Sequence, residues 1–465
     1  MSNGALPDYL SMAKPNSLGN RAPWYKNTAP TYAGIMLWFV FWQDVPTGAG
    51  AVGGVLSHGL GTALVGLILA ALLCHFLYYL VPAMLGVKTG LPLYIVGTST
   101  YGASGGFLMP GFVMGLLQFG WLGVNACFSA AFLVKPFYPD LGLLEVISTP
   151  PHIVVSILWA AAAAFMGLKG IQYVARVATY LPLIPLIILV VLFLRSVGGV
   201  GSFDPAQIGV TAEATGALSA IGVITVLLTY VIGFFATAGA AGTDFGMNSR
   251  DEKDVQMGGL VGIAGATIFA GGLALVIVAG TFGAGKATDA SVLNPTQLMG
   301  ILVGEKTGAV FMWLLAIAAF PPACFSSFIA ANSFKTTLPK VNPFITVGIG
   351  TAVSILLAAT GWAAQVISVF TVIGASFGPV CGAMMVDYIM AGKKWAGPRA
   401  GWNPAGWISW AAGFIVGMLP LVSSVNIPAA PLMAFIVGAV IYFVLAKAGL
   451  ESKVVEMAVP ESAPQ

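Results

Sequence analysis

The sequence predicts an all-α integral membrane protein, and its composition and patterning carry this prediction. The chain has 465 residues, of which 58% are hydrophobic and 8% charged, with a mean hydropathy of +0.93. Soluble domains have roughly 25% charged residues. Apolar stretches of about 20 residues, long enough to cross a bilayer core as helix, recur between 32 and 446. The short alternating segments of a membrane barrel are not seen in the sequence.

Twelve apolar stretches are predicted to be spanning helices of one domain. They cover residues 32–58, 60–83, 107–133, 152–168, 177–194, 220–245, 257–282, 308–333, 343–361, 364–389, 407–424 and 428–446. The polar segment 1–30 contains no apolar run before a cleavage site, so we expect a cytoplasmic N-terminal segment and no signal peptide. Residues 447–465 are predicted to form a mobile cytoplasmic tail.

The distribution of Lys and Arg predicts the orientation of the chain. With twelve spans and both termini in the cytoplasm, 15 of the 19 Lys and Arg residues lie in cytoplasmic segments and 4 in outer loops. Positive residues beside a span stay on the cytoplasmic side, and an odd number of spans would mix the two groups. We therefore expect a multi-pass protein of the inner or plasma membrane. The net charge of +3 reflects this topology and gives no case for nucleic-acid binding.

Two of the predicted spans are interrupted at matching places in the two halves. In FVFWQDVPTGAG (39–50), Gln43 and Asp44 precede Pro46 and two glycines, and ATAGAAGT (236–243) in the sixth span has no side chain larger than Thr. Such pairs indicate an inverted-repeat transporter, because freed backbone groups are tolerated only beside a polar cavity, substrate or ion. We expect an unwound centre of helix 1 that faces a break in helix 6. Small residues that only allow close helix packing are the alternative.

Asp44 is the most unusual residue of the first span. It follows Tyr32 by 12 residues, or about 18 Å of helix, which places it near mid-bilayer. A charge there costs several kcal/mol unless it is paired or hydrated. Four roles stay open: counterion to a cationic substrate or Na⁺, proton carrier, acceptor for freed N–H groups, or neutral structural acid. Asp244 and Asp387 each end a span and are expected to be structural.

Two further spans carry polar groups suited to binding. Gln118 and Trp121 are three residues apart and share a helix face, where an amide and a flat indole suit a planar heterocycle with hydrogen-bonding edges. Ser326 and Ser327, with the carbonyl of Ala323, suit a small hard cation. Packing of the first pair and serine bonds to the parent helix are the alternatives. No phosphate-binding loop, metal-ligand spacing or catalytic constellation is found, so we expect neither an enzyme nor a cofactor.

Together these features resemble the nucleobase–cation symporter family, which includes cytosine, hydantoin and allantoin permeases. The resemblance covers most of residues 30–445. Three stretches carry it: 86–124 with its Lys-Thr-Gly turn and Gln-x-x-Trp pair, 231–245 (VIGFFATAGAAGTDF), and Ala323-x-x-Ser326-Ser327 followed by Asn332.

The resemblance implies a five-plus-five inverted-repeat fold of the LeuT-like type, followed by two further helices. The first repeat would comprise residues 31–195 and the second 196–400, with the last two helices in 401–446. Family members usually have a small neutral residue where this chain has Asp44, which therefore joins the candidate site residues on its own chemistry.

The resemblance also implies the binding residues. Trp121 stacks on the substrate ring, Gln118 bonds its edge, Phe235 supplies the opposing aromatic face, and Thr237 supplies a polar contact. With Asp44 added, the candidate substrate-binding residues are Trp42, Gln43, Asp44, Gln118, Trp121, Phe235, Thr237 and Asn332. The implied sodium ligands are the hydroxyls of Ser326 and Ser327 and the carbonyls of Ala323, Phe39 and Trp42.

The predicted function is a secondary active transporter that imports a small planar nitrogen-rich solute, such as a nucleobase, by alternating access. Its partners are the solute, the lipid membrane and a coupling ion, Na⁺ or H⁺. We favour Na⁺ because Ser326 and Ser327 have the matching spacing. Asp44 suggests the alternative of a carrier for a cationic or amide-type molecule resembling guanidine, urea or an aminopyrimidine. A channel would need a continuous polar stripe, and only isolated polar positions are seen.

Overall fold

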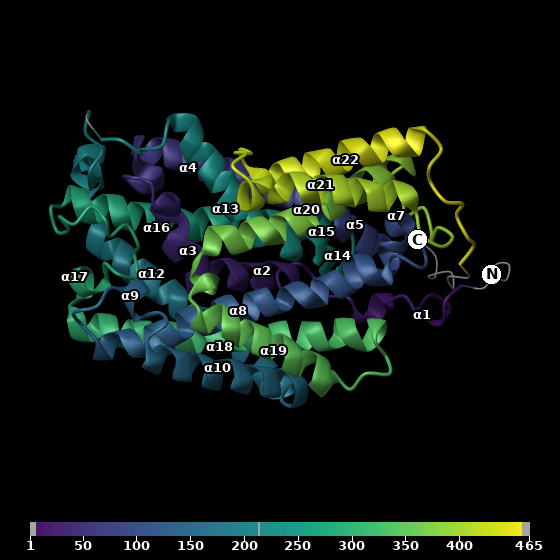
Figure 1. The fold of residues 1–465 in the computed structure, drawn as a ribbon, viewed down its shortest axis with the longest axis horizontal. Coiled ribbons are helices and arrows are strands. Elements are labelled where there is room, and N and C mark those ends of the chain that lie inside the picture. Colours follow the sequence, from purple (N-terminus) through teal and green to yellow (C-terminus); the bar gives the residue numbers. More distant parts are fainter. Residues whose placement is uncertain (1–5, 213, 458–465) are drawn as a thin grey trace.

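The computed structural model describes residues 6–212 and 214–457, and within these ranges it is helical throughout. No strand occurs in them, and their β-type pairing is limited to isolated bridges such as Ala22 with Ser249. The first and last described segments, α1 and the stretch that follows α22, lie at the same end of the molecule, as an even number of spans requires (Figure 1).

The helices follow the predicted spans closely. The first half contains α1 (Asp8–Ser11), α2 (Thr28–Leu37), α3 (Phe39–Asp44), α4 (Gly59–Leu73), α5 (Leu80–Thr89), α6 (Leu93–Val96), α7 (Thr98–Tyr101), α8 (Val113–Val134), α9 (Leu143–Val146), α10 (Pro150–Lys169), α11 (Ile171–Ala178) and α12 (Leu183–Ser196). The remainder contains α13 (Ala220–Ala240), α14 (Gly242–Gly246), α15 (Glu252–Gly259), α16 (Ala266–Gly283), α17 (Met299–Val303), α18 (Glu305–Thr337), α19 (Pro343–Ala359), α20 (Val366–Met390), α21 (Pro404–Val422) and α22 (Ala430–Lys447). Short 3₁₀ or π segments complete the chain: η1 (Leu18–Asn20), η2 (Val45–Gly50), η3 (Gly54–Leu56), η4 (Cys74–Tyr79), η5 (Phe107–Phe112), η6 (Lys135–Phe137), η7 (Val197–Ser202), η8 (Pro205–Ile208), η9 (Leu260–Gly265) and η10 (Trp362–Ala364).

The count of spans agrees with the prediction. In the described residues, ten helical units are long and apolar enough to cross a membrane, and α19 is a shorter apolar helix. The broken pair α2 and α3 supplies the first span. In Figure 1, α20, α21 and α22 form one side of the molecule, α10, α18 and α19 form the other, and α2 and α8 lie between them.

Helix 1 is broken, but not where the prediction placed the break. The helix is interrupted at Trp38, whose ψ of 127° is extended, and it resumes as α3. The unwound centre predicted within 39–50 is wrong for its first half, because Phe39–Asp44 form helix α3, and the non-helical residues of this stretch, Gly48 and Ala49, lie in the turn that ends the span. Proline fits the first turn of a 3₁₀ segment as well as a helix break, so its presence alone does not locate the interruption.

Helix 6 is broken within the predicted stretch, near its end. α13 ends at Ala240 and α14 begins at Gly242, with a turn at Ala241. Asp244, just beyond this break, accepts a hydrogen bond from the Leu93 backbone N–H at 3.0 Å. Its carboxylate therefore joins helix 6 to the beginning of α6, the structural role expected from the sequence.

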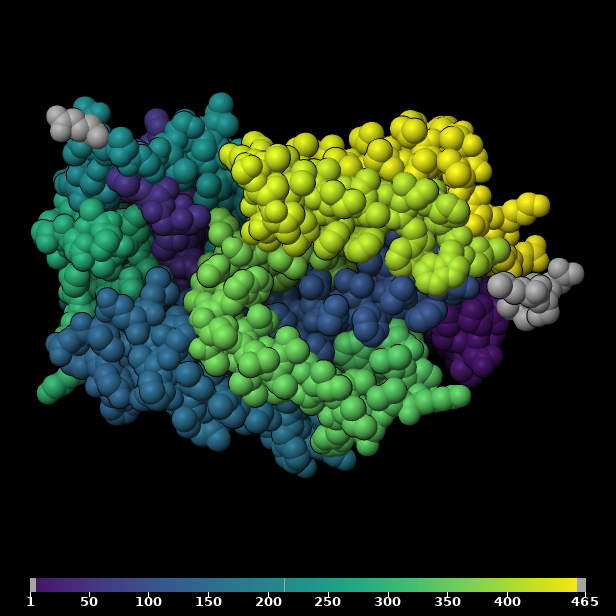
Figure 2. All heavy atoms as spheres, viewed as in Figure 1, coloured from purple at the N-terminus to yellow at the C-terminus, as the bar shows by residue number. Residues whose placement is uncertain are grey.

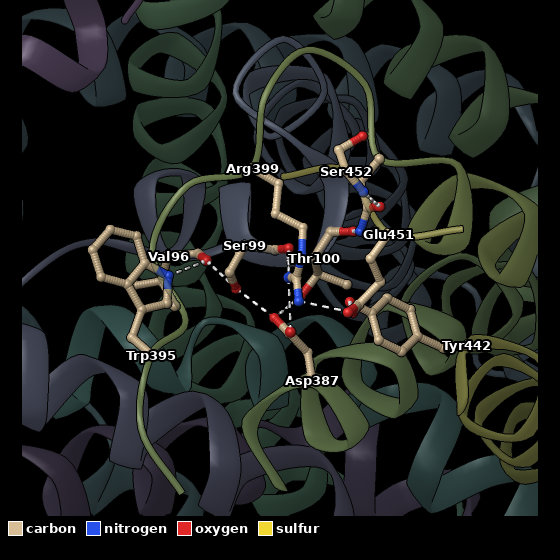
Figure 3. A network of polar contacts seen from close by, with 10 residues as sticks. Val96, Ser99, Thr100, Asp387, Trp395, Arg399, Tyr442, Glu451 and Ser452 are labelled. Carbon is tan, nitrogen blue, oxygen red and sulfur yellow. Dashed lines mark hydrogen bonds and ion pairs between the residues drawn. The ribbon is translucent and has the colours of Figure 1, made fainter. Parts of the chain in front are cut away.

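The C-terminal segment is fastened to the helices and does not form the mobile tail that was predicted. Arg399, Asp387, Glu451, Ser99 and Thr100 form a buried cluster, the Arg399 network (Figure 3). The Arg399 guanidinium lies 2.8 Å from the Asp387 carboxylate and 2.7 Å from that of Glu451, and it also donates to the Ser99 carbonyl. Asp387 accepts from the hydroxyls of Ser99 and Thr100 at 2.6 and 3.2 Å. Residues 451–455 are therefore held in place, whereas 458–465 lie outside the described residues.

Candidate functional site

A cavity of about 1250 Å³ lies between α2, α8, α13 and α18. Lys26, Asn248 and Lys335 lie on its wall, next to the start of α2, the end of α14 and the end of α18, and we call this end of the cavity its mouth. The N-terminal segment borders this mouth, because the Asn16 side chain donates to that of Asn248 at 2.8 Å. Trp38, at the break in helix 1, also lies on the cavity wall.

Aromatic rings enclose the part of the cavity between Trp38 and Trp121, which we call the head of the cavity. The Trp121 ring lies 6.0 Å from that of Trp38 and 5.2 Å, edge to face, from that of Phe234. Behind it, Phe370 of α20 lies 5.4 Å from Trp121. The Trp121 indole N–H donates to the Thr237 hydroxyl at 3.2 Å, which fixes the orientation of the ring. The arrangement leaves flat aromatic walls that suit a planar ligand.

Two polar side chains with unused hydrogen-bonding capacity, Gln118 and Thr237, lie beside these rings. Gln118 is buried, and the hydrogen bond found for its amide is a weak one to the Met114 sulfur at 3.7 Å. Thr237 accepts from Trp121 but has its own O–H free to donate. The neighbouring Asn125 side chain is already hydrogen-bonded within the protein, because its amide donates to the Ala319 carbonyl and accepts from the Trp159 indole.

The charged side chains on the cavity wall lie away from the head. Among the described residues, those on the wall are Lys26, Asp244 and Lys335. The two lysines stand at the mouth, and Asp244 lies beyond the helix 6 break. The head is thus neutral, polar on one edge and aromatic on its faces.

Four predicted substrate residues reach the cavity wall: Gln118, Trp121, Thr237 and Asn332. Asn332 lies nearer the mouth than the others, on the last turns of α18. The Gln-x-x-Trp spacing therefore did place both side chains on the face of α8 that lines a cavity.

Trp42 and Phe235 do not reach the cavity wall. Trp42 is fully buried, and its indole N–H donates at 2.9 Å to the Leu37 carbonyl, which the break at Trp38 leaves without its usual helical partner. Phe235 is fully buried and packs on Tyr32, with ring centres 5.7 Å apart.

The cavity-facing aromatics on these helices are Trp38 and Phe234, which sequence reasoning missed. Trp38 lies four residues before Trp42, one helical turn away, and Phe234 lies next to Phe235. A hydrophilic stripe would have identified the correct face, but both helices are apolar all round.

Gln43 and Asp44 lie at the opposite end of helix 1 from the mouth. Asp44 is the last residue of α3 and follows Thr28, the first residue of α2, by 16 residues, so it lies toward the far end of this broken span, whereas the sequence placed it near the middle. Its carboxylate accepts from the Asn294 amide at 3.4 Å, and Gln43 accepts from the Thr296 hydroxyl at 3.2 Å. Neither side chain lines the cavity, so both instead join helix 1 to the loop before α17.

The residues predicted to hold sodium do not converge in this conformation. Ser326 lines the cavity, whereas Ser327 is fully buried, donates to the Ala323 carbonyl at 3.4 Å, and faces Gly167 of α10. In α3, the Tyr230 hydroxyl contacts the carbonyls of Val40 and Phe41 at 2.9 and 2.8 Å. The sodium site stays a prediction.

Comparison with solved structures identifies the fold. The chain superposes on inward-facing Mhp1 with a TM-score of 0.65 at 14% identity, covering 98% of this chain and 97% of that one. Mhp1 closed on bromovinylhydantoin, described as a nucleobase-cation-symport-1 family transporter, gives 0.61 at 15% identity with 95% of each chain covered. A Na⁺-coupled sialic acid symporter gives 0.55 at 13% identity, covering 94% of this chain and 92% of that one. The fold is the five-plus-five inverted repeat with two further helices.

Sequence comparison finds relatives among the cytosine permeases. No family model matches the chain. Cytosine permease of Escherichia coli K12 is 25% identical over 351 residues, which cover 74% of each protein. The chain is thus similar in sequence to a cytosine permease and in fold to a nucleobase-cation-symport-1 family transporter. These similarities support a secondary active membrane transporter, with helices 1 and 6 of the fold both reaching the cavity described above.

Proposed function

We propose that this symporter imports a small, neutral, planar, nitrogen-rich solute, a nucleobase or related heterocycle, bound at the head of the cavity. The aromatic enclosure of Trp121, Trp38 and Phe234, beside an uncommitted amide and hydroxyl, carries the proposal. One ring of the substrate stacks on Trp121. Its polar edge meets Gln118, which offers a donor and an acceptor, and Thr237, which offers a donor.

The neutral head of the cavity favours a neutral solute over a cationic one. A cation at this depth would need a carboxylate. Asp44 lies outside the cavity wall, and Asp244, which is on the wall, is seven residues beyond Thr237 and accepts a hydrogen bond from the Leu93 backbone N–H. Aromatic faces alone attract a cation by about 0.5–2 kcal/mol, which is less than the several kcal/mol needed to remove it from water. The cationic alternative therefore loses its main support, whereas neutral amide-type molecules stay compatible.

We propose Na⁺ as the coupling ion, with H⁺ as the alternative. The hydroxyl of Ser326 faces the cavity and can turn toward helix 1 when the cavity closes. An ion that bridges helices 1 and 8 favours the substrate-binding conformation only to the extent that it binds that state more tightly. The similarity of the coordinates to the inward-facing Mhp1 structure, and the mouth beside both termini, support an inward-open state if the termini are cytoplasmic as predicted.

Uptake into proteoliposomes tests the proposal. Purified protein is reconstituted with an inward Na⁺ gradient, an inward H⁺ gradient or neither, and labelled cytosine, uracil, hydantoin and guanidine are compared. We expect saturable uptake of a neutral heterocycle that collapses when the driving gradient is removed. Uptake of guanidinium in preference to every neutral heterocycle would contradict the assignment of the neutral head as the binding site.

A further inference from the structure

A second hollow lies on the lipid-facing side of the molecule, separate from the transport cavity. This acyl groove, about 470 Å³, runs between α8, α19 and α20 and is walled almost wholly by apolar side chains. Its wall extends from Leu338 and Thr346 at one end to Leu357 and Trp362 at the other. Figure 2 shows the chain of α19 and η10, in light green, lying across the blue α8 on this face.

The length of the groove matches one hydrocarbon chain of one leaflet. Thr346 and Leu357 are both on α19, and helix rise places them about 16 Å apart. The hydrocarbon core of a bilayer is about 30 Å thick, so one leaflet contributes about 15 Å. The groove wall on α19 is therefore about as long as one leaflet is thick.

One end of the groove is basic. Lys340 lies two residues beyond Leu338 of the groove wall, and Lys169 reaches across from α10 to lie 5.3 Å from the Phe344 ring at the start of α19. Neither lysine has an ion-pair partner among the described residues. No acidic residue occurs anywhere between Glu305 and Asp387 in the sequence. The segment that contains Lys340 and α19 therefore carries only positive charges.

We propose that the acyl groove and its two lysines form a binding site for one anionic phospholipid. An acyl chain fills the groove, and the phosphate lies between Lys169 and Lys340, where basic residues at a membrane surface attract anionic headgroups. The lipid contacts the back of α8, because Phe119 and Gly120 line the groove while Gln118 and Trp121 line the transport cavity. The bound acyl chain thus packs against α8, the helix whose opposite face lines the transport cavity.

The glycines of this region provide a matched pair of variants. A Cβ added at Gly120 would meet no atom within 4 Å, and the residue lines the groove, so a larger side chain there enters the space of the lipid. A Cβ added at Gly348 of α19 also meets no atom within 4 Å, but that residue lies outside the groove wall. Both positions are helical, so replacement by Leu favours the helix in each case.

The test is lipid retention measured by native mass spectrometry. Wild type, Gly120→Leu, Gly348→Leu and a Lys169→Gln, Lys340→Gln double variant are released from micelles that contain equal phosphatidylglycerol and phosphatidylcholine. We expect wild type and Gly348→Leu to retain one phosphatidylglycerol, and Gly120→Leu to lose it. The double variant should lose the preference for phosphatidylglycerol, by about fivefold for each lysine.

Equal retention of the two lipids by wild type would show only ordinary surrounding lipid and would overturn the proposal, as would undiminished retention by Gly120→Leu. Thermal melting identifies a variant that fails to fold, and in that case Val353→Trp blocks the groove from α19 instead. None of these measurements involves transport, so their outcome is independent of the proposed function.

Discussion

Replacing Trp121 tests the substrate site most directly. Trp121→Ala removes the ring that lies between Trp38 and Phe234 and frees the Thr237 hydroxyl. Stacking of a base on an aromatic side chain contributes about 1–3 kcal/mol. At 1.4 kcal/mol for each factor of ten, the dissociation constant should rise about 5- to 150-fold.

Trp121→Phe separates the two contributions of this side chain. It keeps an aromatic face and loses only the indole bond to Thr237, which is worth about 0.5–1.5 kcal/mol, so the loss should be about 2- to 12-fold. Binding is measured by isothermal titration or by a scintillation proximity assay with the transported heterocycle. Trp410→Ala is the matched control, because Trp410 stacks on Phe414 of α21 outside the cavity. If Trp121→Ala binds within twofold of wild type, the head of the cavity is not the substrate site.

Three further substitutions test other parts of the structure. Arg399→Met leaves the buried Asp387 carboxylate without its cation, so stability should fall by about 3–5 kcal/mol, read as a lower unfolding midpoint. Ser326→Ala should raise the Na⁺ concentration for half-maximal uptake severalfold, whereas Ser327→Ala should stay near wild type because Ser327 lies outside the cavity wall and its hydroxyl donates to the Ala323 carbonyl of its own helix. Asp44→Asn should change the uptake rate and leave the ranking of neutral over cationic solutes intact, measured by competition.

Each of these expectations has a contrasting outcome. Adding Asp387→Asn to Arg399→Met should recover part of the lost stability, and failure to do so would place the damage outside the ion pair. Equal Na⁺ effects of Ser326→Ala and Ser327→Ala would mean that the two hydroxyls act at one ion. A reversed solute ranking in Asp44→Asn would return that carboxylate to the substrate site.

The apolar periodicity predicted the spans well, because bilayer thickness sets the length of a helix that crosses it. The pair Gln118 and Trp121 was placed correctly because helical spacing alone puts them on one face. The register of helix 1 was not predictable in the same way. Its interruption at Trp38 involves no Pro or Gly at that position and is stabilised by the Trp42 indole, which bonds the freed Leu37 carbonyl.

Asp44 and the end of the chain show a second limit of sequence reasoning. Asp44 was predicted to lie near the middle of its span because the apolar run continued past it, whereas α3 ends at Asp44 and its partner Asn294 comes from a distant loop. The polar composition of the C-terminal segment suggested mobility. Its order depends on Arg399, which lies in a loop and is paired by tertiary contacts that a local pattern does not contain.

The Arg399 network also sets an order of events during synthesis. Arg399 is 300 residues later in the chain than Ser99, whose carbonyl it contacts, and Glu451 follows later still. At a rate of synthesis of about 5–20 residues per second, Arg399 is made about 15–60 s after the α6–α7 segment that it contacts. Until then the Asp387 carboxylate and the hydroxyls around it have no cation. This end of the molecule is therefore completed only after the last helices have been synthesised, and a nascent chain that stalls before residue 399 exposes an unfinished surface to quality control.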